Sequence, residues 1–481
     1  MGLSAPRGGQ SRNSPSRVKK AETKTGVSFA RSAAKPGLIA RKTAHRLLGA
    51  ILDAGTSMDG LTDENHGHPH YLALDVRDRA LVRAILLSAL RHHGDLSAIV
   101  DGFMGKPLPA GASPVRHILV AGLAQILFLD VPDHSAADLA VTAANDDPRT
   151  RRFGKLVNAL LRRASREKDE LIAGIRERPR RSPPWFAQRL ETIYGQETAA
   201  AIDARHRIEA PIDITLKRSE QRQAGRWAER LGAVVLSTGT LRLEGRSHDV
   251  ASLSGYTEGA WWVQDAAAAI PARLFGDISG KRALDLCAAP GGKTAQLADG
   301  GAQVTALDAS NSRLKRLREN MSRLKLADAL ETVASDLFAF RPDAPFENVL
   351  LDAPCSSTGT VRRHPDVPFT KSMANVEKLA SLQARMLDRA AEFVAPGGMI
   401  IFSNCSLDSL EGEDVASAFA ESHPEFESVP VLPEETPGLS GSTTRHGFLR
   451  LTPAHLDLGA HERSGVDGFF AARFRRISVP S

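Results

Sequence analysis

The feature that most constrains the fold is a regular alternation of short apolar runs and helical patterns from about residue 256 onward. The apolar runs are RALDLC, QVTALD, ENVLLD and GMIIFSNCS, and stretches with helical spacing, such as SRLKRLRENMSRL, separate them. Strands that alternate with helices in this way form parallel sheets with right-handed crossovers. We therefore expect an α/β domain over residues 256–478, closed by an antiparallel hairpin of GFLRLTP and GFFAARFRR.

The residues in front of this domain have a different character. Residues 38–166 show apolar spacings of i, i+3 and i+4 without strand-like alternation, which predicts an all-α domain. A linker is expected at 167–184, where the prolines of ERPRRSPP end the helical pattern. Residues 185–255 combine helical segments with the strand-like runs IDITLK and AVVLSTGTLRLEG. They predict a small α/β subdomain.

Positive charge gathers in two stretches of the chain. Residues 1–38 hold eight Lys/Arg against one acid, Glu22, whereas the whole chain has a net charge of +6. Because residues 1–37 are rich in Gly, Ser and Pro, they are predicted to form a disordered tail. Residues 149–181 hold twelve Lys/Arg against four acids. Such a run is either a solvated face or a surface for nucleic-acid phosphates, and charge alone does not decide between them.

Several classes of protein are excluded by what the sequence lacks. No apolar run approaches the roughly 18 residues of a membrane span. The basic N-terminal stretch has no apolar segment of the kind found in secretory signals. The three cysteines, Cys287, Cys355 and Cys405, are too few and too scattered for a disulfide framework or a zinc site. We therefore expect a cytoplasmic protein without a bound metal, and a monomer.

The loop after the first predicted strand, CAAPGGKT at 287–294, carries the first chemical signal. Its small residues allow the backbone to approach a ligand at the carboxyl end of the strand, where doubly wound sheets bind cofactors. The run GGKT resembles the end of a P-loop, but Cys287 stands where the first glycine would be. A nucleoside-triphosphate cradle is therefore excluded. A purely structural turn is the alternative to a cofactor loop.

Two carboxylates follow the next strands of the predicted sheet. Asp308 ends QVTALD, at the position where Rossmann-type sheets hydrogen-bond ribose hydroxyls. Asp336 lies in ASDLF after the third strand, where the adenine of a cofactor would lie. Either residue alone can be explained as a cap of the following segment. Together with the glycine-rich loop at the same edge, they favour a nucleotide-like cofactor.

Two of the three cysteines lie at the carboxyl ends of adjacent predicted strands. Cys355 lies in LLDAPCSSTG after the fourth strand, and Cys405 lies in FSNCSL at the end of the fifth. A free cysteine is usually a small buried hydrophobe. Two cysteines beside small polar residues, at the edge that carries the cofactor loop, favour thiol chemistry instead.

These motifs resemble those of a known family. DLCAAPGGKT, LLDAPCSSTG followed by VRRHPD, and NCS are similar to motifs of the RsmB/NOP2/Sun family of RNA 5-methylcytosine methyltransferases, over about residues 185–476. Residues 38–166 resemble the NusB-like RNA-binding domain in front of the bacterial 16S rRNA enzyme of that family. The resemblance implies a Rossmann-like class I methyltransferase domain with a mostly parallel seven-stranded sheet. It implies S-adenosylmethionine as cofactor and RNA, first of all a 16S rRNA loop, as partner.

The resemblance also assigns roles to residues. It implies that Cys405 is the nucleophile and that Cys355 assists product release. The implied cofactor site consists of Cys287, Ala288, Ala289, Pro290, Gly291, Gly292, Lys293, Asp308, Asp336 and Asp352. The chain departs from the family pattern at Asn404, where a threonine usually precedes the nucleophile.

The chemistry explains why these residue types are needed. Carbon 5 of cytosine is a poor nucleophile, and attack of a thiolate on carbon 6 turns it into an enamine that accepts a methyl group. Lys293 is the expected source of positive charge for the Cys405 thiolate, and Asp352 the expected partner of the cytosine N3/N4 edge. The base must leave its stack to reach a buried thiolate, so a single-stranded or looped cytosine is expected.

Three other classes remain as alternatives. An RNA-binding factor with an inactive catalytic half would explain the helical region but not an intact cofactor loop with two cysteines. A methyltransferase for small molecules or proteins would share the loop and the acids, but needs no cysteine pair. A DNA cytosine methyltransferase would use the cysteine after the fourth strand, which here is Cys355.

Overall fold

The computed structural model describes residues 35–109, 111–180, 182–245, 249–460 and 462–478. The predicted disordered tail at 1–37 lies almost wholly outside the described residues. Residues from Gly37 onward form one unit, to which the following description applies. Within the described ranges, none of the helices combines the length and the apolar character that crossing a membrane requires.

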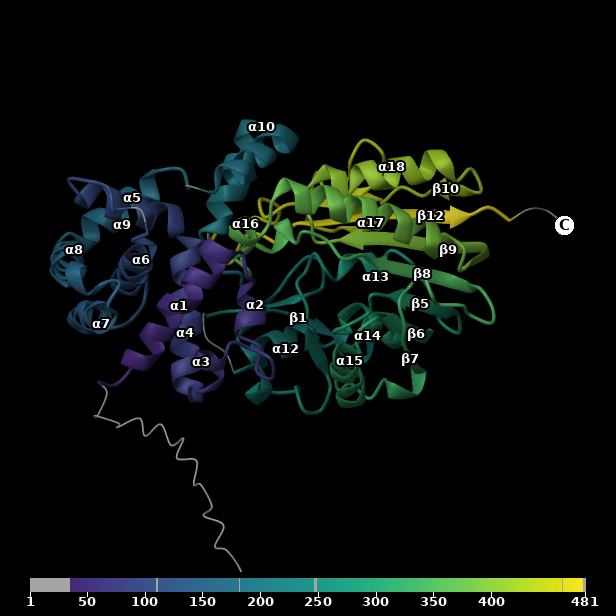
Figure 1. Ribbon diagram of the computed structural model, residues 1–481. Helices are drawn as coiled ribbons and strands as arrows, with labels where there is room; N and C mark the ends of the chain where they lie inside the picture. Colours follow the sequence, from purple (N-terminus) through teal and green to yellow (C-terminus); the bar gives the residue numbers. More distant parts are fainter. Residues whose placement is uncertain (1–34, 110, 181, 246–248, 461, 479–481) are drawn as a thin grey trace, which may run out of the picture. The chain divides into compact units, whose positions relative to one another are not determined.

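The front of this unit is helical, as the apolar spacing predicts (Figure 1). The helix α6 lies at its centre, because its sequence is apolar nearly all round and its residues from Ile118 to Leu127 are buried against the neighbouring helices. The elements are α1 (Leu38–Ala54), α2 (Met58–Leu61), α3 (Pro69–Leu72), α4 (Val76–Arg91), α5 (His93–Phe103), α6 (Ser113–Phe128), α7 (Asp133–Asp146), η1 (Arg151–Phe153), α8 (Gly154–Arg166) and α9 (Lys168–Glu177).

The helix α9 corrects the expected linker at 167–184. Its residues Leu171 and Ile172 pack against the core of the helical region, and Ile175 is buried in it. The prolines at 179, 183 and 184 led to the prediction of a linker for the whole segment. They end the helical pattern only after α9, so the linker is shorter than expected.

A small antiparallel sheet follows, with the strand order β2-β3-β1-β4. It runs past the expected boundary at residue 255, since β4 pairs with β1 and places Trp261 opposite Leu216 in a buried cluster. The elements of this part are α10 (Pro184–His206), β1 (Asp213–Leu216), α11 (Arg218–Gln221), α12 (Ala224–Leu231), β2 (Ala233–Val235), β3 (Leu241–Leu243), η2 (Val250–Ser252) and β4 (Trp261–Val263).

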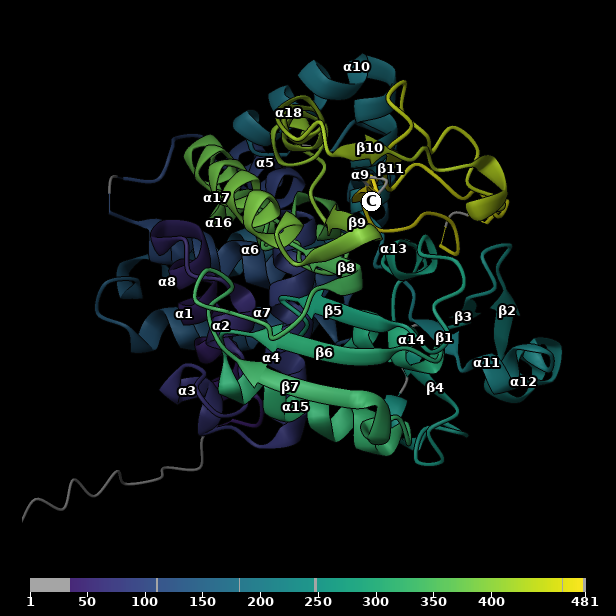
Figure 2. The ribbon, with the colours of Figure 1, turned by 90° about the vertical axis from the view of Figure 1, so that its right-hand side faces the viewer.

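The large sheet has the strand order β10-β12-β9-β8-β5-β6-β7, with β11 paired to β12 outside this path (Figure 2). The strands β5 to β9 are parallel, and β12 is antiparallel to β9. The predicted hairpin is confirmed, since β11 pairs antiparallel with β12. The sheet has eight strands where seven were expected, because β10 and β11 pair with opposite ends of β12 and share one edge position.

Helices cover both faces of this sheet. Alternate residues of β5 point to opposite faces, so that Ala283 joins the core beneath α13, α14 and α15 while Leu284 joins the core beneath α17 and α18. The elements are α13 (Ile270–Arg273), β5 (Arg282–Leu286), α14 (Gly292–Asp299), β6 (Gln303–Asp308), α15 (Asn311–Arg323), η3 (Ala327–Ala329), β7 (Leu330–Ala334), β8 (Phe346–Asp352), η4 (Thr358–Thr360), α16 (Val367–Thr370), α17 (Met373–Ala391), β9 (Val394–Asn404), η5 (Ser409–Glu411), α18 (Glu413–Ser422), β10 (Phe426–Ser428), η6 (Pro433–Glu435), β11 (Leu449–Leu451) and β12 (Phe469–Arg476).

Buried charges join the small sheet to the large one. Arg363 donates to Asp265 at 2.7 Å and to Asp467 at 2.9 Å. Nearby, Arg242 binds the carboxylate of Asp213 through two hydrogen bonds of 2.7 Å, and both side chains are fully buried. Buried charges are tolerated only when they are paired in this way. The Arg242–Asp213 pair thus joins β3 to β1 within the small sheet, and Arg363 connects the segment after β4 to the segment before β12.

Candidate active site

The glycine-rich loop connects β5 to α14, and side chains of β6 and α15 hold it in place through hydrogen bonds. The Ala289 N–H donates to Asp308 Oδ2 at 3.3 Å, and Arg313 on α15 donates to the Ala289 carbonyl. Gly291 has φ of 104°, and a Cβ there would lie 2.9 Å from Leu317 Cγ. The turn thus needs glycine both for its backbone conformation and for its close approach to α15.

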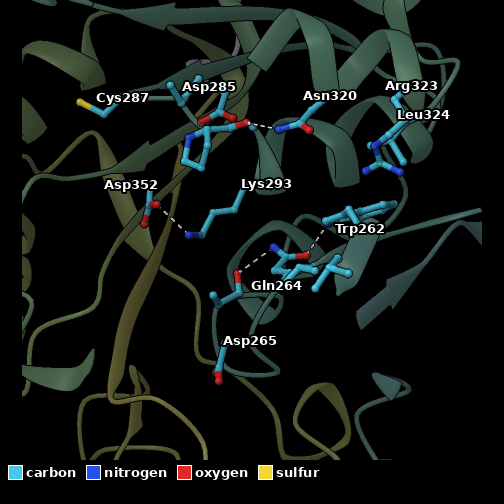
Figure 3. A pocket seen from close by; sticks show the side chains of 18 of the residues that line it. Trp262, Gln264, Asp265, Asp285, Cys287, Lys293, Asn320, Arg323, Leu324 and Asp352 are labelled. Carbon is cyan, nitrogen blue, oxygen red and sulfur yellow. Dashed lines mark hydrogen bonds and ion pairs between the residues drawn. The ribbon is translucent and has the colours of Figure 1, made fainter. Parts of the chain in front are cut away.

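This loop forms one wall of a cavity of about 330 Å³ (Figure 3). Residues 287–293, Asp285 and Asp352 line the sheet side, and Figure 3 shows the Lys293 side chain projecting between Asp352 and the pair Trp262–Gln264. The opposite wall is lined by Val250, Tyr256, Trp262, Val263, Gln264, Asp265, Ala268, Asn320, Arg323 and Leu324. The small sheet and the large sheet therefore meet at this cavity.

An ion pair of Lys293 and Asp352 forms part of the cavity lining. Lys293 Nζ lies 2.7 Å from Asp352 Oδ2 and 4.7 Å from the centre of the Phe469 ring. The other carboxylate oxygen of Asp352 accepts a hydrogen bond from Ser403 Oγ at 2.9 Å. The structure thus brings the predicted residues Lys293 and Asp352 together. The Phe469 ring is the second partner of Lys293, and Ser403 is the second partner of Asp352.

Asp285 is a functional candidate that the sequence interpretation missed. It lies inside β5 and is fully buried; its Oδ2 accepts from Thr294 Oγ1 at 2.6 Å, while Oδ1 has no hydrogen-bond partner. Burial, above all, raises the pKa of this carboxyl to about 7. An unpartnered carboxylate oxygen at the wall of a cavity is suited to a cationic ligand group. The available signal was a charged residue in the middle of the buried run ALDLC.

The two cysteines that the sequence singled out are in contact. The strands β8 and β9 are parallel neighbours, with Asp352 opposite Ser403, so the loops after them lie at the same edge. Cys355 Sγ lies 3.4 Å from Cys405 Sγ, and both are free thiols. Ser357 Oγ lies 4.0 Å from Cys355 Sγ.

The contact makes the two thiols unequal. The hydrogen bond from Cys355 lowers the pKa of Cys405 below its ordinary value, with a smaller contribution from Lys293, against the opposing effects of burial and Asp352. The same hydrogen bond, together with burial, raises the pKa of Cys355 well above its ordinary value. Cys405 is therefore the more readily ionised thiol of the pair. The expected positive charge of Lys293 is present, but the thiol partner is the larger influence.

The third cysteine has a different environment. Burial, with the nearby Asp352 and Asp308, raises the pKa of Cys287 to about 12. A thiol held neutral in this way is a wall of the cavity and not a nucleophile.

The two acids after β6 and β7 do not line the cavity. Asp308 is buried behind the loop, where it accepts from Ser310 N at 2.9 Å and pairs with Arg313 at 3.2 Å. It thus anchors the loop and also stabilises the start of α15. Asp336 is exposed and accepts a hydrogen bond from Phe338 N at 2.8 Å, which is a local turn. Cys355 and Cys405 do not line the cavity either, but Cys405 is close enough to its lining residues Asp352 and Lys293 for their charges to affect its pKa.

Comparisons with known proteins cover both halves of the chain. The model of the NusB family matches residues 38–166, and the model described as 16S rRNA methyltransferase RsmB/F matches residues 277–475. Among solved structures, one titled PH0851 superposes with a TM-score of 0.64 at 21% identity, covering 91% of this chain and 99% of that one. A methyltransferase homologue from Pyrococcus horikoshii superposes with a TM-score of 0.51 at 25% identity, covering 61% of this chain and 94% of that one.

A curated relative extends the similarity over nearly the whole length. Ribosomal RNA small subunit methyltransferase B of Pseudomonas putida is 32% identical over 451 residues, which cover 91% of this chain and 99% of the relative. The resemblance inferred from the loop and cysteine motifs is thereby confirmed. With its helical front, its cofactor-type loop and its paired thiols all within the matched length, the chain belongs to the RsmB/F family of 16S rRNA methyltransferases.

Proposed function

We propose that this protein methylates carbon 5 of a cytosine in RNA, with S-adenosylmethionine as methyl donor and Cys405 as nucleophile. The observation that carries the proposal is the contact of 3.4 Å between Cys355 and Cys405, beside the Lys293–Asp352 pair. The names of the relatives indicate small-subunit rRNA as the substrate class.

The cavity residues fit the proposed cofactor. S-adenosylmethionine supplies an electrophilic methyl group on a sulfonium. The unpartnered Asp285 Oδ1 is suited to accept hydrogen bonds from its ammonium group, and the loop 287–293 offers a wall of small residues. Asp308 would hold this loop in place, with Asp336 and Asp352 at the flanking strand ends. These assignments extend the residues implied by the family motif.

The first step uses the lower pKa of Cys405 relative to that of Cys355. The Cys405 thiolate donates an electron pair to cytosine carbon 6, and the displaced π electrons make carbon 5 nucleophilic towards the methyl group. As Cys405 attacks carbon 6, negative charge develops at N3, and a proton delivered through Asp352, which binds the N3/N4 edge of the base and is oriented by Lys293, neutralises it.

The second step releases the product. Loss of the carbon-5 proton to a base supplies the electron pair that restores the 5,6 double bond, and the bond from carbon 6 to Cys405 Sγ breaks. Once Cys405 is bound to carbon 6, it no longer accepts the hydrogen bond from Cys355. The largest cause of the raised Cys355 pKa is then gone. Cys355 is then the nearest sulfur available as the base.

Separate substitution of the two cysteines tests this assignment. Cys405→Ala should abolish methylation and form no protein–RNA adduct, because the nucleophile is gone. Cys355→Ala should still attack and methylate but release slowly, and so accumulate a covalent complex, seen as a retarded band on a denaturing gel. Cys287→Ala is the matched thiol control: because Cys287 lines the cofactor cavity, it is assayed at saturating cofactor, where it should form no adduct and keep the chemical step.

The reverse pattern would overturn the proposal. An adduct with Cys405→Ala and none with Cys355→Ala would identify the cysteine after β8 as the nucleophile. Full activity in both variants would exclude the thiol mechanism altogether.

The helical region at 38–166 is proposed to contact RNA phosphates. Lys155, Arg162 and Arg166 are exposed and recur at helical spacing along α8, within the basic stretch that the sequence revealed. Contacts between such side chains and phosphates are electrostatic and carry little sequence information. The choice of the target cytosine would then belong to the cavity and the cysteine edge.

A further inference from the structure

A buried carboxylate lies between the two loops that carry the cysteines. Glu411 ends the short helix η5, and its accessible surface is zero. The family motif assigns it no role in the chemistry described above. Burial raises the pKa of its carboxyl, and the hydrogen bonds it accepts oppose that shift.

All the side-chain contacts of Glu411 are with neutral donors. Its Oε1 accepts from Ser356 N at 2.8 Å and from Gln383 Nε2 at 3.0 Å. Its Oε2 accepts from the Ser406 hydroxyl at 2.6 Å and from the Ser356 hydroxyl. A buried carboxylate with this many donors is fixed in position, since each lost hydrogen bond would leave a polar group unsatisfied.

The donors are the direct neighbours of the reactive sulfurs. Ser356 follows Cys355, and Ser406 follows Cys405. Asn404, on the other side of Cys405, donates to the Glu411 carbonyl at 2.6 Å and accepts from Ser406 N at 2.9 Å. One residue therefore clamps the backbone on which both thiols stand, and the asparagine that replaces the usual threonine is part of the clamp.

We propose that Glu411 is the positioning residue that sets the contact between Cys355 and Cys405. A single carboxylate oxygen bridges the hydroxyls of Ser356 and Ser406, and so fixes the separation of the two loops. The hydrogen bond between the thiols weakens steeply with distance, so it should be sensitive to this bridge, which acts together with the direct contact of 3.2 Å between the Ser356 and Ser406 hydroxyls. The consequence for methylation rests on the proposed function; the consequence for the thiols does not.

The charges around the thiol pair favour the same arrangement. Asp352 on β8 and Lys293 on α14 face Cys405, and Glu411 faces Cys355, where its charge helps to keep that thiol protonated. Loss of Glu411 therefore removes the bridge and also a cause of the protonation of Cys355. The loss of the bridge weakens the donor that stabilises the ionised Cys405, and the loss of the charge makes Cys355 easier to ionise in its place.

The test measures the thiols directly, without RNA or cofactor. The rate of alkylation of Cys405 by iodoacetamide, followed by peptide mass spectrometry against pH, reports the fraction of thiolate. In Glu411→Ala the midpoint should move up by about one pH unit or more, which means alkylation slower by roughly fivefold or more at the wild-type midpoint. Glu411→Gln keeps a carbonyl acceptor for Ser356 N and should fall between the two.

A matched control separates positioning from general stability. Asp408 is another buried carboxylate near Cys405, but its side chain binds Arg189, at 2.7 Å through both oxygens, and caps η5 at Leu410 N, at 3.0 Å, through an acceptor oxygen that asparagine retains. Asp408→Asn should lower the melting temperature and leave the alkylation profile of Cys405 unchanged. Ser406→Ala removes one arm of the clamp and provides a milder variant if Glu411→Ala does not fold.

The outcomes are distinct. An alkylation profile of Glu411→Gln and Ser406→Ala that coincides with the wild type would overturn the positioning role. A shifted profile, in a protein whose Cys405→Ala variant still methylates RNA, would support the clamp and refute the proposed nucleophile instead.

Discussion

The protonation of Asp285 should control the binding of S-adenosylmethionine. The carboxyl is fully buried, with a pKa raised to about 7 and with Oδ1 unpartnered at the cavity wall. If Oδ1 binds the cofactor ammonium, binding requires the ionised carboxyl. Below pH 7 the free protein must first lose a proton, so the affinity should fall with decreasing pH.

The size of the effect follows from linkage. One pH unit below the pKa, about nine tenths of Asp285 is protonated, and the affinity should be about tenfold lower than its plateau, or about 1.4 kcal/mol. Asp285→Asn removes the charge-assisted hydrogen bond, worth roughly 1.5–3 kcal/mol, which corresponds to a loss of affinity of about ten- to more than hundredfold. Its residual affinity should not change between pH 5.5 and 7.

The stability of the free protein should depend on pH in the opposite direction to the cofactor affinity. The pKa of Asp285 is raised above its unfolded value, so the folded state binds the proton more tightly, and stability falls as the pH rises from about 4 to 7. Asp285→Asn should therefore raise the melting temperature at pH 8 and leave it nearly unchanged at pH 4.

Titration calorimetry from pH 5.5 to 8.5 measures the affinities. Below pH 7 the cofactor ammonium, with a pKa of about 8 for an α-amino group, stays protonated, so the slope reports the protein alone. Asp299→Asn is the control, because Asp299 lies at the far end of α14 and binds Arg218 N at 2.7 Å. An affinity independent of pH in the wild type would refute the role of Asp285.

Two further predictions concern packing and RNA. A Cβ on Gly359 would lie 2.2 Å from the Gly468 carbonyl oxygen and 2.7 Å from that of Cys405, so Gly359→Ala should cost a few kcal/mol of stability and abolish methylation, measured by thermal unfolding and methyl transfer. Gly225→Ala, with open space around it, should do neither. Replacing Lys155, Arg162 and Arg166 by glutamine should lower the slope of log K for RNA against log salt by about two units, and an unchanged slope would exclude phosphate contacts by α8.

Much of the architecture was predictable because its signals are local. The apolar runs ending in Asp308, Asp352 and Asn404 marked strands whose carboxyl ends share one edge, and this alone placed both cysteines beside the loop. The strand β11 was predicted as part of the closing hairpin, but β10 gave no signal, since a run of three residues shows no periodicity. It forms only against the end of β12, which comes much later in the sequence.

The parts of the site that escaped prediction depend on distance and burial. The motif identified Cys405 and Lys293, but the greater influence of Cys355 on the thiolate appears only when the two sulfurs are found 3.4 Å apart. In the sequence, Asp285 is a single charged residue within an apolar strand. The structure makes it a candidate because its Oδ1 is buried without a hydrogen-bond partner. Glu411 lies in a segment without a motif, and only tertiary contact brings it to both loops.

The position of β12 in the sheet has a consequence for synthesis. This strand comprises residues 469–476, yet it lies inside the sheet, between β9 on one side and β10 and β11 on the other. A ribosome has therefore made more than 460 residues before β9 can pair with β12 at its second edge. Only then can the Phe469 ring contact Lys293. Until then the nascent chain presents an open strand edge next to Cys405, the kind of surface that pairs with other chains. A translation arrest shortly before residue 469 should yield a chain that chaperones retain, whereas an arrest after residue 476 should release a closed sheet.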